Sequence, residues 1–208
     1  MKRHFFTFFI FILCGLSWII VLKGGVKSAD IEEPFSVSID GVSKTPILGD
    51  AKISIEQARS WAEGRGATED FINIADVYWE IGTLMGIRAD VLYAQSAKET
   101  AFGRYAGNVT ADMNNWAGIK RVNATGDERD DHESFATSEA GVQGHFNHMA
   151  AYVGVEPLGM IHQRYYTVLS IGWAGTVKFV EDLSGKWAPA VDYGESVVND
   201  FLNTMNSE

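Results

Sequence analysis

Cysteine is almost absent from this chain of 208 residues. The one cysteine, Cys14, lies inside the apolar run Phe5–Leu22. The chain beyond that run therefore has no disulfide, and its stability must come from its apolar core. Lipid attachment at Cys14 is disfavoured, because Phe11, Ile12 and Leu13 before it are not small and the apolar run continues past it. We interpret Cys14 as an apolar residue of the run.

Basic residues are also scarce. The chain has 17 Lys and Arg against 27 Asp and Glu, a formal net charge of −10. The first 28 residues hold four of the basic residues and no acidic one, so the remainder carries 13 basic against 27 acidic side chains. Such a surface repels phosphate groups, and we expect neither nucleic acid nor anionic lipid headgroups as partners. A neutral or mixed-charge glycan stays compatible with this charge.

The N-terminal segment has the pattern of an export signal. Lys2, Arg3 and His4 precede the 18-residue apolar run, and Val26 and Ser28 stand where small residues of a cleavage site belong. The run is also just long enough to cross a bilayer. We therefore predict that residues 1–28 are a signal peptide or a membrane anchor. In either case the protein is exported, to the extracellular space and cell wall or to the outer face of the cytoplasmic membrane, and touches membrane only through this segment.

Most of the remaining sequence has a helical pattern. Residues 29–50 mix Pro, Gly, Ser and Asp without a period and are interpreted as a linker, and residues 51–208 as one domain. The pattern predicts helices from a Ser54–Gln57 capping box, from Thr68 to about Gly86, from Asp90 to about Thr100, from Ser138 to 154, over 173–183 and over 195–205. Residues 120–135 are polar and predict a short irregular β-hairpin or flap. The expected fold class is mostly α (α+β), with a small β/loop lobe facing the helix of residues 90–100.

Glu99 ends that helix and shares a face with Leu92 and Gln95. Phe102 and Gly103 then break the helix, and a Gly-rich, aromatic-rich loop follows. Apolar, half-buried surroundings raise the pKa of a glutamic acid, which keeps it protonated near neutral pH. A protonated carboxyl beside aromatic rings is what hydrolysis of a sugar polymer requires. The alternative is a surface Glu paired with a neighbouring basic residue.

Four segments together resemble a known family: LYAQSAKETAFGRYAG, NNWAGIK, ESFATSEAGVQGHFNHMAAYVG and WAGTVKFVEDLSGKWAPAVDYGESVVNDFL. Their order and spacing resemble the glucosaminidase domains of glycoside hydrolase family 73, in the lysozyme-like superfamily, over roughly residues 53–205. The resemblance implies an endo-β-N-acetylglucosaminidase that cleaves the β-1,4 bond after N-acetylglucosamine in bacterial peptidoglycan. It implies glycan strands as the partner, no cofactor and a monomer.

The resemblance also implies roles for individual residues. Glu99 falls on the family's general acid, Trp116 on the aromatic residue of an asparagine–aromatic–GIK turn, and Tyr193 on a tyrosine near the C-terminal end. Many members carry a second acidic residue in a longer β-lobe. Here that lobe is only about fifteen residues long, so the second carboxylate is not assigned by alignment.

The second catalytic group therefore stays open. Four acidic residues of the lobe are candidates, with Asp131 ranked first and Asp127 second, followed by Asp130 and Glu133. The alternative is that all four form a solvated acidic loop. A further possibility is attack by the substrate's own 2-acetamido group, positioned by Tyr193.

Substrate-binding candidates lie on either side of the predicted cleft. Trp116 and Phe102 are candidates for stacking on sugar rings or for core packing, and Asn114 and Asn115 for binding the acetamido group or for capping their turn. His145 and His148 have a spacing that two metal ligands could use, but no further ligand completes a site, and we predict no metal.

Two other functions remain open on the sequence. A lytic transglycosylase also uses one Glu but forms an anhydro sugar without water. A non-catalytic, membrane-anchored glycan-binding protein of wall or spore assembly is the alternative from another class.

Overall fold

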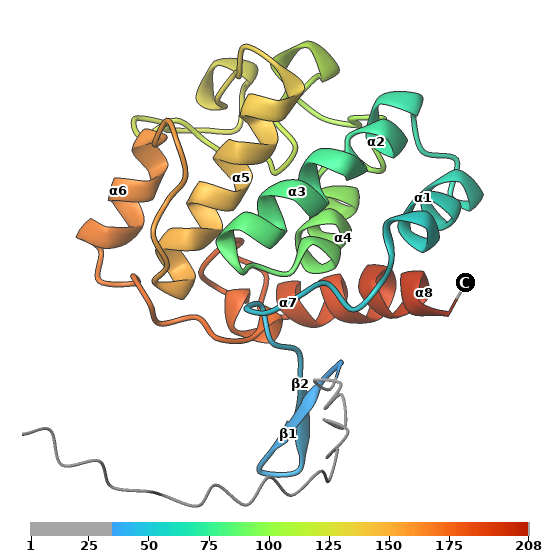
Figure 1. The fold of residues 1–208 in the computed structure, drawn as a ribbon. Coiled ribbons are helices and arrows are strands. Elements are labelled where there is room, and N and C mark those ends of the chain that lie inside the picture. Colours follow the sequence, from blue (N-terminus) through green and yellow to red (C-terminus); the bar gives the residue numbers. More distant parts are fainter. Residues whose placement is uncertain (1–34, 208) are drawn as a thin grey trace, which may run out of the picture. The chain divides into compact units, whose positions relative to one another are not determined.

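A computed structural model describes residues 35–207, and the predictions for residues 1–34 lie outside that range. The described chain is mostly helical, as expected (Figure 1). Its helices are α1 (Ile55–Gly64), α2 (Glu69–Asn73), α3 (Ala75–Met85), α4 (Ala89–Thr100), α5 (Ser138–Val153), α6 (Gln163–Ser170), α7 (Tyr193–Ser196) and α8 (Asn203–Asn206), with a π-helical stretch, Val197–Leu202, between the last two. Within residues 35–207 no helix has the length and apolar character needed to cross a bilayer.

The segment expected to be a linker is ordered in its second half. Strands β1 (Val37–Ile39) and β2 (Val42–Lys44) form an antiparallel hairpin. Asp40 and Gly41 connect them with positive φ angles of 50° and 79°, which is the backbone that an Asp-Gly hairpin turn requires. Ile47, three residues after the end of β2, is fully buried. The linker prediction is therefore wrong for residues 37–48. The Asp and Gly residues that suggested a linker form the turn of a hairpin.

The first helices follow the sequence closely. The Ser54–Gln57 capping box at the start of α1 is present as predicted. The helix predicted from Thr68 to Gly86 is divided into α2 and α3 at Ile74, and α3 ends at Gly86 in the left-handed conformation. The face predicted to be apolar is buried in both helices: Phe71, Ile74, Ala75, Tyr78 and Ile81.

Helix α4, which carries Glu99, is a central helix. Ten of its twelve residues are buried, and it packs against α3 and the C-terminal helical segment (Figure 1). Its N-cap is Arg88, two residues before the predicted cap Asp90. Asp90 instead forms a buried ion pair with Arg88 at 2.7 Å. A helix buried on nearly all sides holds the side chains at its end in fixed positions.

One predicted element of the second half differs. Residues 173–183 form only a 3-10 turn at Val180–Leu183, and α6 was not predicted. Residues 120–135, which we call the lobe, form an irregular flap, one of the two forms predicted: an isolated antiparallel bridge joins Lys120 to His132, and a 3-10 turn covers Arg129–Asp131. The lobe keeps its shape through side-chain hydrogen bonds, such as those that Asp131 accepts. Such bonds leave no periodic pattern in the sequence.

Candidate active site

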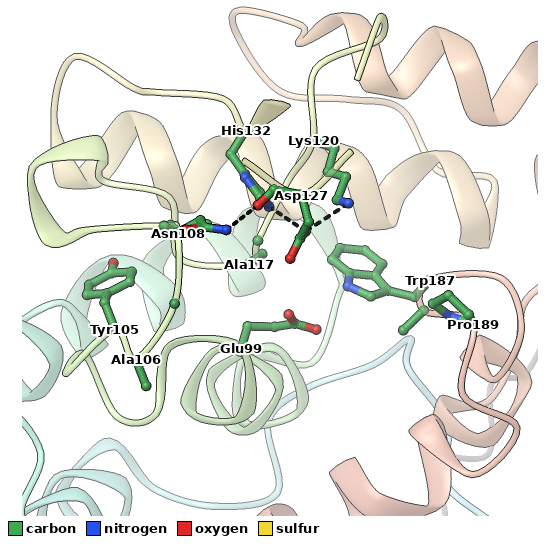
Figure 2. A pocket seen from close by; sticks show the side chains of 14 residues that line it. Glu99, Tyr105, Ala106, Asn108, Ala117, Lys120, Asp127, His132, Trp187 and Pro189 are labelled. Carbon is green, nitrogen blue, oxygen red and sulfur yellow. Dashed lines mark hydrogen bonds and ion pairs between the residues drawn. The ribbon is translucent and has the colours of Figure 1, made fainter. Parts of the chain in front are cut away.

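A cleft of about 460 Å³ lies at the C-terminal end of α4 (Figure 2). Its walls come from four places in the sequence: Glu99 on α4, the loop 105–109, the segment 117–120 with the lobe, and the loop 187–189. Figure 2 shows Glu99 on one side of the cleft and Asp127 on the other, with Trp187 beside them. The cleft is open to solvent and so could admit a polymer chain.

Glu99 projects from the last turn of α4 and is half-buried. Burial raises the pKa of its carboxyl group, an effect that a hydrogen bond from Tyr193, the charge of Lys98 and the Trp187 side chain oppose. Gly118 lies directly against it, because a Cβ at that position would stand 3.1 Å from Glu99 Oε2. A glycine is also needed there for its φ of +59°. The carboxyl group therefore has the raised pKa that a proton donor needs.

The chain turns sharply after Glu99. Ala101, Phe102 and Tyr105 all have positive φ angles, between 49° and 60°, which is unusual for residues with a side chain. The turn directs Phe102 into the core, where its ring lies 4.8 Å from that of Trp61. Phe102 is thus a core residue, and its candidacy as a sugar-stacking residue is corrected. Tyr105 lines the cleft instead.

Asp127 supplies the carboxylate of the opposite wall. Lys120 Nζ donates a hydrogen bond to Asp127 Oδ1 at 2.8 Å, and His132 Nε2 lies 3.4 Å from the same oxygen. The hydrogen bond and charge of Lys120 lower the pKa of Asp127. Asn108, from the loop across the cleft, donates to the Asp127 backbone oxygen at 2.5 Å. Asp127 is therefore an exposed, ionised carboxylate at a defined position.

Asp131, ranked first from the sequence, has a different place. Its carboxylate accepts hydrogen bonds from the backbone N–H groups of Thr125 and Glu128, both at 3.0 Å. It lines a separate depression, together with Asp130 and Glu133. The ranking of the acidic residues is corrected accordingly. Asp131 shapes the lobe, and the residue that this shape brings to the Glu99 cleft is Asp127.

The side chains of Asn114 and Asn115 are hydrogen-bonded within and around the turn at residues 114–119. The Asn115 amide donates to the backbone oxygens of Ile119 and Glu133 and accepts from the Ile119 N–H. The Asn114 amide donates to the Phe135 oxygen and accepts from Ser138. Neither residue lines the cleft, so the acetamido-binding role considered for both is corrected to a turn-capping role.

Trp116 is also absent from the lining of the cleft. Its side chain is only 3% exposed, and its indole N–H donates to the Ser138 backbone oxygen at 3.2 Å. Its candidacy for sugar stacking is corrected to core packing. Trp187 is the indole that lines the cleft, and it was missed because it stands in a loop without periodicity. The signal for it was present, since Trp187 lies six residues before Tyr193 in a segment that carries the resemblance.

Tyr193, which the resemblance placed on a family tyrosine, contacts Glu99. Its side chain is buried, and its hydroxyl donates a hydrogen bond to Glu99 Oε1. The candidate metal ligand His145 is fully buried, hydrogen-bonded at both ring nitrogens, and burial lowers its pKa to about 3. Over residues 35–207 no group of three or more His, Cys, Asp or Glu side chains is arranged to hold a metal ion.

The geometry has the parts of a glycoside hydrolase site. A carboxyl with a raised pKa and an ionised carboxylate lie on opposite walls of one open cleft, on a mostly helical domain. Comparison with known proteins agrees. The model of the glucosaminidase family, described as mannosyl-glycoprotein endo-beta-N-acetylglucosaminidase, matches residues 75–206. The chain belongs to this family and is a glycoside hydrolase.

A curated relative adds little about function. A protein of Borreliella burgdorferi, named only as an uncharacterized protein, is 27% identical over 140 residues, which cover 66% of this chain. The chain spans about 65% of the length of that relative. No solved structure matches the chain.

Proposed function

We propose that the protein is an endo-β-N-acetylglucosaminidase that hydrolyses the β-1,4 bond after N-acetylglucosamine in bacterial peptidoglycan. One observation carries the catalytic part of this proposal: the pKa values of two carboxyl groups on one cleft are displaced in opposite directions. Burial raises that of Glu99, and Lys120 lowers that of Asp127. Paired carboxyls with opposed pKa shifts divide into acid and base roles at one pH.

Glu99 is the general acid in this mechanism. Its proton passes to the glycosidic oxygen as the bond to the anomeric carbon breaks, and the leaving sugar departs as an alcohol. Gly118 and the half-buried end of α4 limit the water around the carboxyl, which keeps it protonated until substrate arrives.

Asp127 has the second role. As an ionised carboxylate it stabilises the positive charge that develops at the anomeric carbon, and it orients either the attacking water or the substrate's 2-acetamido group. Its exposed position suits contact with water, and its ion pair with Lys120 fixes its direction, with His132 Nε2 3.4 Å away. A nearby second carboxylate supports hydrolysis over a transglycosylase reaction that uses one Glu alone.

The substrate's sugar faces are proposed to pack on Trp187 and Tyr105, the aromatic residues of the cleft lining. The protein is further proposed to act as a monomer outside the cytoplasm. Export would depend on the basic and apolar pattern of residues 1–28, and that segment would supply its only membrane contact.

The test is digestion of purified peptidoglycan by the full-length protein, with mass spectrometry of the released fragments. We expect fragments with N-acetylglucosamine at the reducing end, absent when Glu99→Gln is used. Anhydro-muramic ends would identify a lytic transglycosylase. Wall binding without release, by wild type and variant alike, would favour a glycan-binding protein.

A further inference from the structure

Behind Glu99 a line of four hydrogen bonds runs into the core. Tyr193 donates to Glu99 Oε1, and Gln95 Nε2 lies 3.0 Å from the Tyr193 hydroxyl. His145 Nε2 lies 3.1 Å from Gln95 Oε1, and the Tyr78 hydroxyl lies 3.0 Å from His145 Nδ1. The four residues behind Glu99 are all buried and come from α3, α4, α5 and α7. We call these four residues the relay.

The relay has one consistent direction. His145 is neutral, because burial lowers its pKa to about 3, so one ring nitrogen donates and the other accepts. If Nε2 carries the proton, it donates to Gln95 Oε1, and Nδ1 accepts from Tyr78. The Gln95 N–H then donates to the Tyr193 oxygen, and the Tyr193 proton can only be directed to Glu99. Every donor in the line meets an acceptor.

This direction determines which oxygen of Glu99 holds its proton. Oε1 accepts from Tyr193, so a proton on the carboxyl group must lie on Oε2. Oε2 is the oxygen that lies against Gly118, and Gly118 is a residue of the cleft lining. In the reverse direction Tyr193 would donate to Gln95, and Oε1 would hold the proton and turn it toward Tyr193, away from the cleft.

The relay is also held firmly. The ring of His145 meets that of Tyr78 edge to face at 5.8 Å, and lies 5.4 Å from the ring of Trp187 in the cleft wall. Tight packing leaves the imidazole few alternative orientations, and a buried polar network of this kind favours one arrangement only when all its members are satisfied.

We propose that His145 and Gln95 are positioning residues that direct the Tyr193 proton to Glu99 Oε1 and so place the catalytic proton of Glu99 on the oxygen facing the substrate. Gln95 Oε1, which can only accept, selects the Nε2-protonated tautomer of His145, and Tyr78 terminates the relay by donating to His145 Nδ1. The proposal rests on the proposed function for its catalytic consequence, but the direction of the relay is a property of the folded protein alone.

The first measurement is independent of activity. Nitrogen-15 NMR of the imidazole groups in the full-length protein reports the tautomer and charge of His145, assigned by comparison with His145→Gln. We expect the neutral tautomer protonated on Nε2, unchanged between about pH 4 and 9. A proton on Nδ1, or a titration within that range, would overturn the proposal.

The second measurement uses an isosteric change that reverses the relay. In Gln95→Glu the new side chain, when ionised, has no donor and accepts from both His145 and Tyr193, so the Tyr193 proton leaves Glu99. Because position 95 is fully buried, the ionisation of the new carboxyl is checked by infrared spectroscopy of its carboxylate band at the pH of the assay. We expect kcat to fall about tenfold or more, the loss associated with one hydrogen bond to an ionisable group, with KM nearly unchanged. The alkaline limb of the kcat profile should move to higher pH, since a donor that favoured ionised Glu99 is lost.

Controls separate direction from packing. Gln163→Glu makes the same change on exposed α6 and should leave kcat and its pH profile unaltered. His145→Phe keeps a ring but removes the donor and should resemble Gln95→Glu, while His145→Gln restores an N–H donor and should recover part of kcat. Wild-type kcat and pH profile in His145→Phe, or in Gln95→Glu with its new carboxyl ionised, would refute the proposal. An inactive wild type with the expected His145 tautomer would refute the proposed function instead.

Discussion

Glu99 and Asp127 face one cleft, but the parts of the molecule that hold them differ in most physical respects. Glu99 stands on α4, a helix buried on nearly all sides, and is reached from behind by a line of buried side chains. Asp127 stands on the lobe, where most side chains are exposed. Burial favours the neutral acid on one wall, and a neighbouring lysine favours the carboxylate on the other. The two environments, and not the residue types, give the two carboxyl groups the opposite pKa shifts on which the proposed roles depend.

The largest expected effect comes from removing the acid. Glu99→Gln keeps the shape but cannot give up a proton, so kcat should fall about 10²- to 10⁴-fold, the usual contribution of general acid catalysis. Release of glycan fragments and binding to insoluble wall would be measured together. Binding should persist, and Glu80→Gln on the exposed side of α3 serves as the matched control. Full activity of Glu99→Gln would show that Glu99 is not the general acid.

The wild-type pH profile follows from the same residue. In the proposed mechanism Glu99 acts in its protonated form, so activity should be present below its raised pKa and lost as pH rises through it. Asp127 acts in its ionised form, so activity should be lost as pH falls through its lowered pKa, below the ordinary range of an aspartate. Rates of fragment release across pH would show both limbs. A profile without an alkaline limb would contradict the role of Glu99.

The lobe wall is tested by Asp127→Asn. Loss of the negative charge should lower kcat about a hundredfold and remove the acid limb, because no carboxylate then stabilises the anomeric centre or orients its attacker. Asp130→Asn, an exposed neighbour that lines the other depression, is the control and should retain wild-type kcat. If both variants were equally active, the substrate's acetamido group would carry the second step without help from the lobe.

A smaller effect is expected at the contact between Tyr193 and Glu99. Tyr193→Phe removes the hydroxyl donor, which favours the ionised form of Glu99, so the pKa of Glu99 should rise further and the alkaline limb should move to higher pH. The same change should reduce kcat about tenfold. Tyr105→Phe, at the other side of the cleft, is a matched control. An alkaline limb that did not move would show that Tyr193 does not act on the ionisation of Glu99.

The two walls also differ in how far the sequence predicts them. The α4 wall follows from local patterns: a helix of known length places Gln95 and Glu99 one turn apart, and the family motif includes both. His145 lies fifty residues from Gln95 along the chain, and its place beside Gln95 depends on how α5 packs in the folded protein. Sequence spacing therefore predicts the acid but not the line of residues behind it.

The lobe has no period from which to choose among its acidic residues. The choice depends on one tertiary feature, the bridge between Lys120 and His132, which closes the segment into a loop with Asp127 near its tip. Asp131 lies beside the bridge and is used by backbone N–H groups. The side chains of the two bridge residues, Lys120 and His132, lie against the Asp127 carboxylate at the cleft. These contacts depend on the folded chain, which is why Asp131 was ranked too high.

The smallest expected effect separates the indole in the cleft from the indole in the core. Trp187→Ala should raise KM for glycan about three- to tenfold, as expected for losing one aromatic contact, with little loss of stability. Trp116→Ala, whose indole is buried behind the turn, should instead lower the free energy of unfolding by about 3–5 kcal/mol. Steady-state kinetics and denaturant unfolding on both variants measure the contrast. If Trp116→Ala raised KM without loss of stability, Trp116 and not Trp187 would be the indole that contacts the glycan.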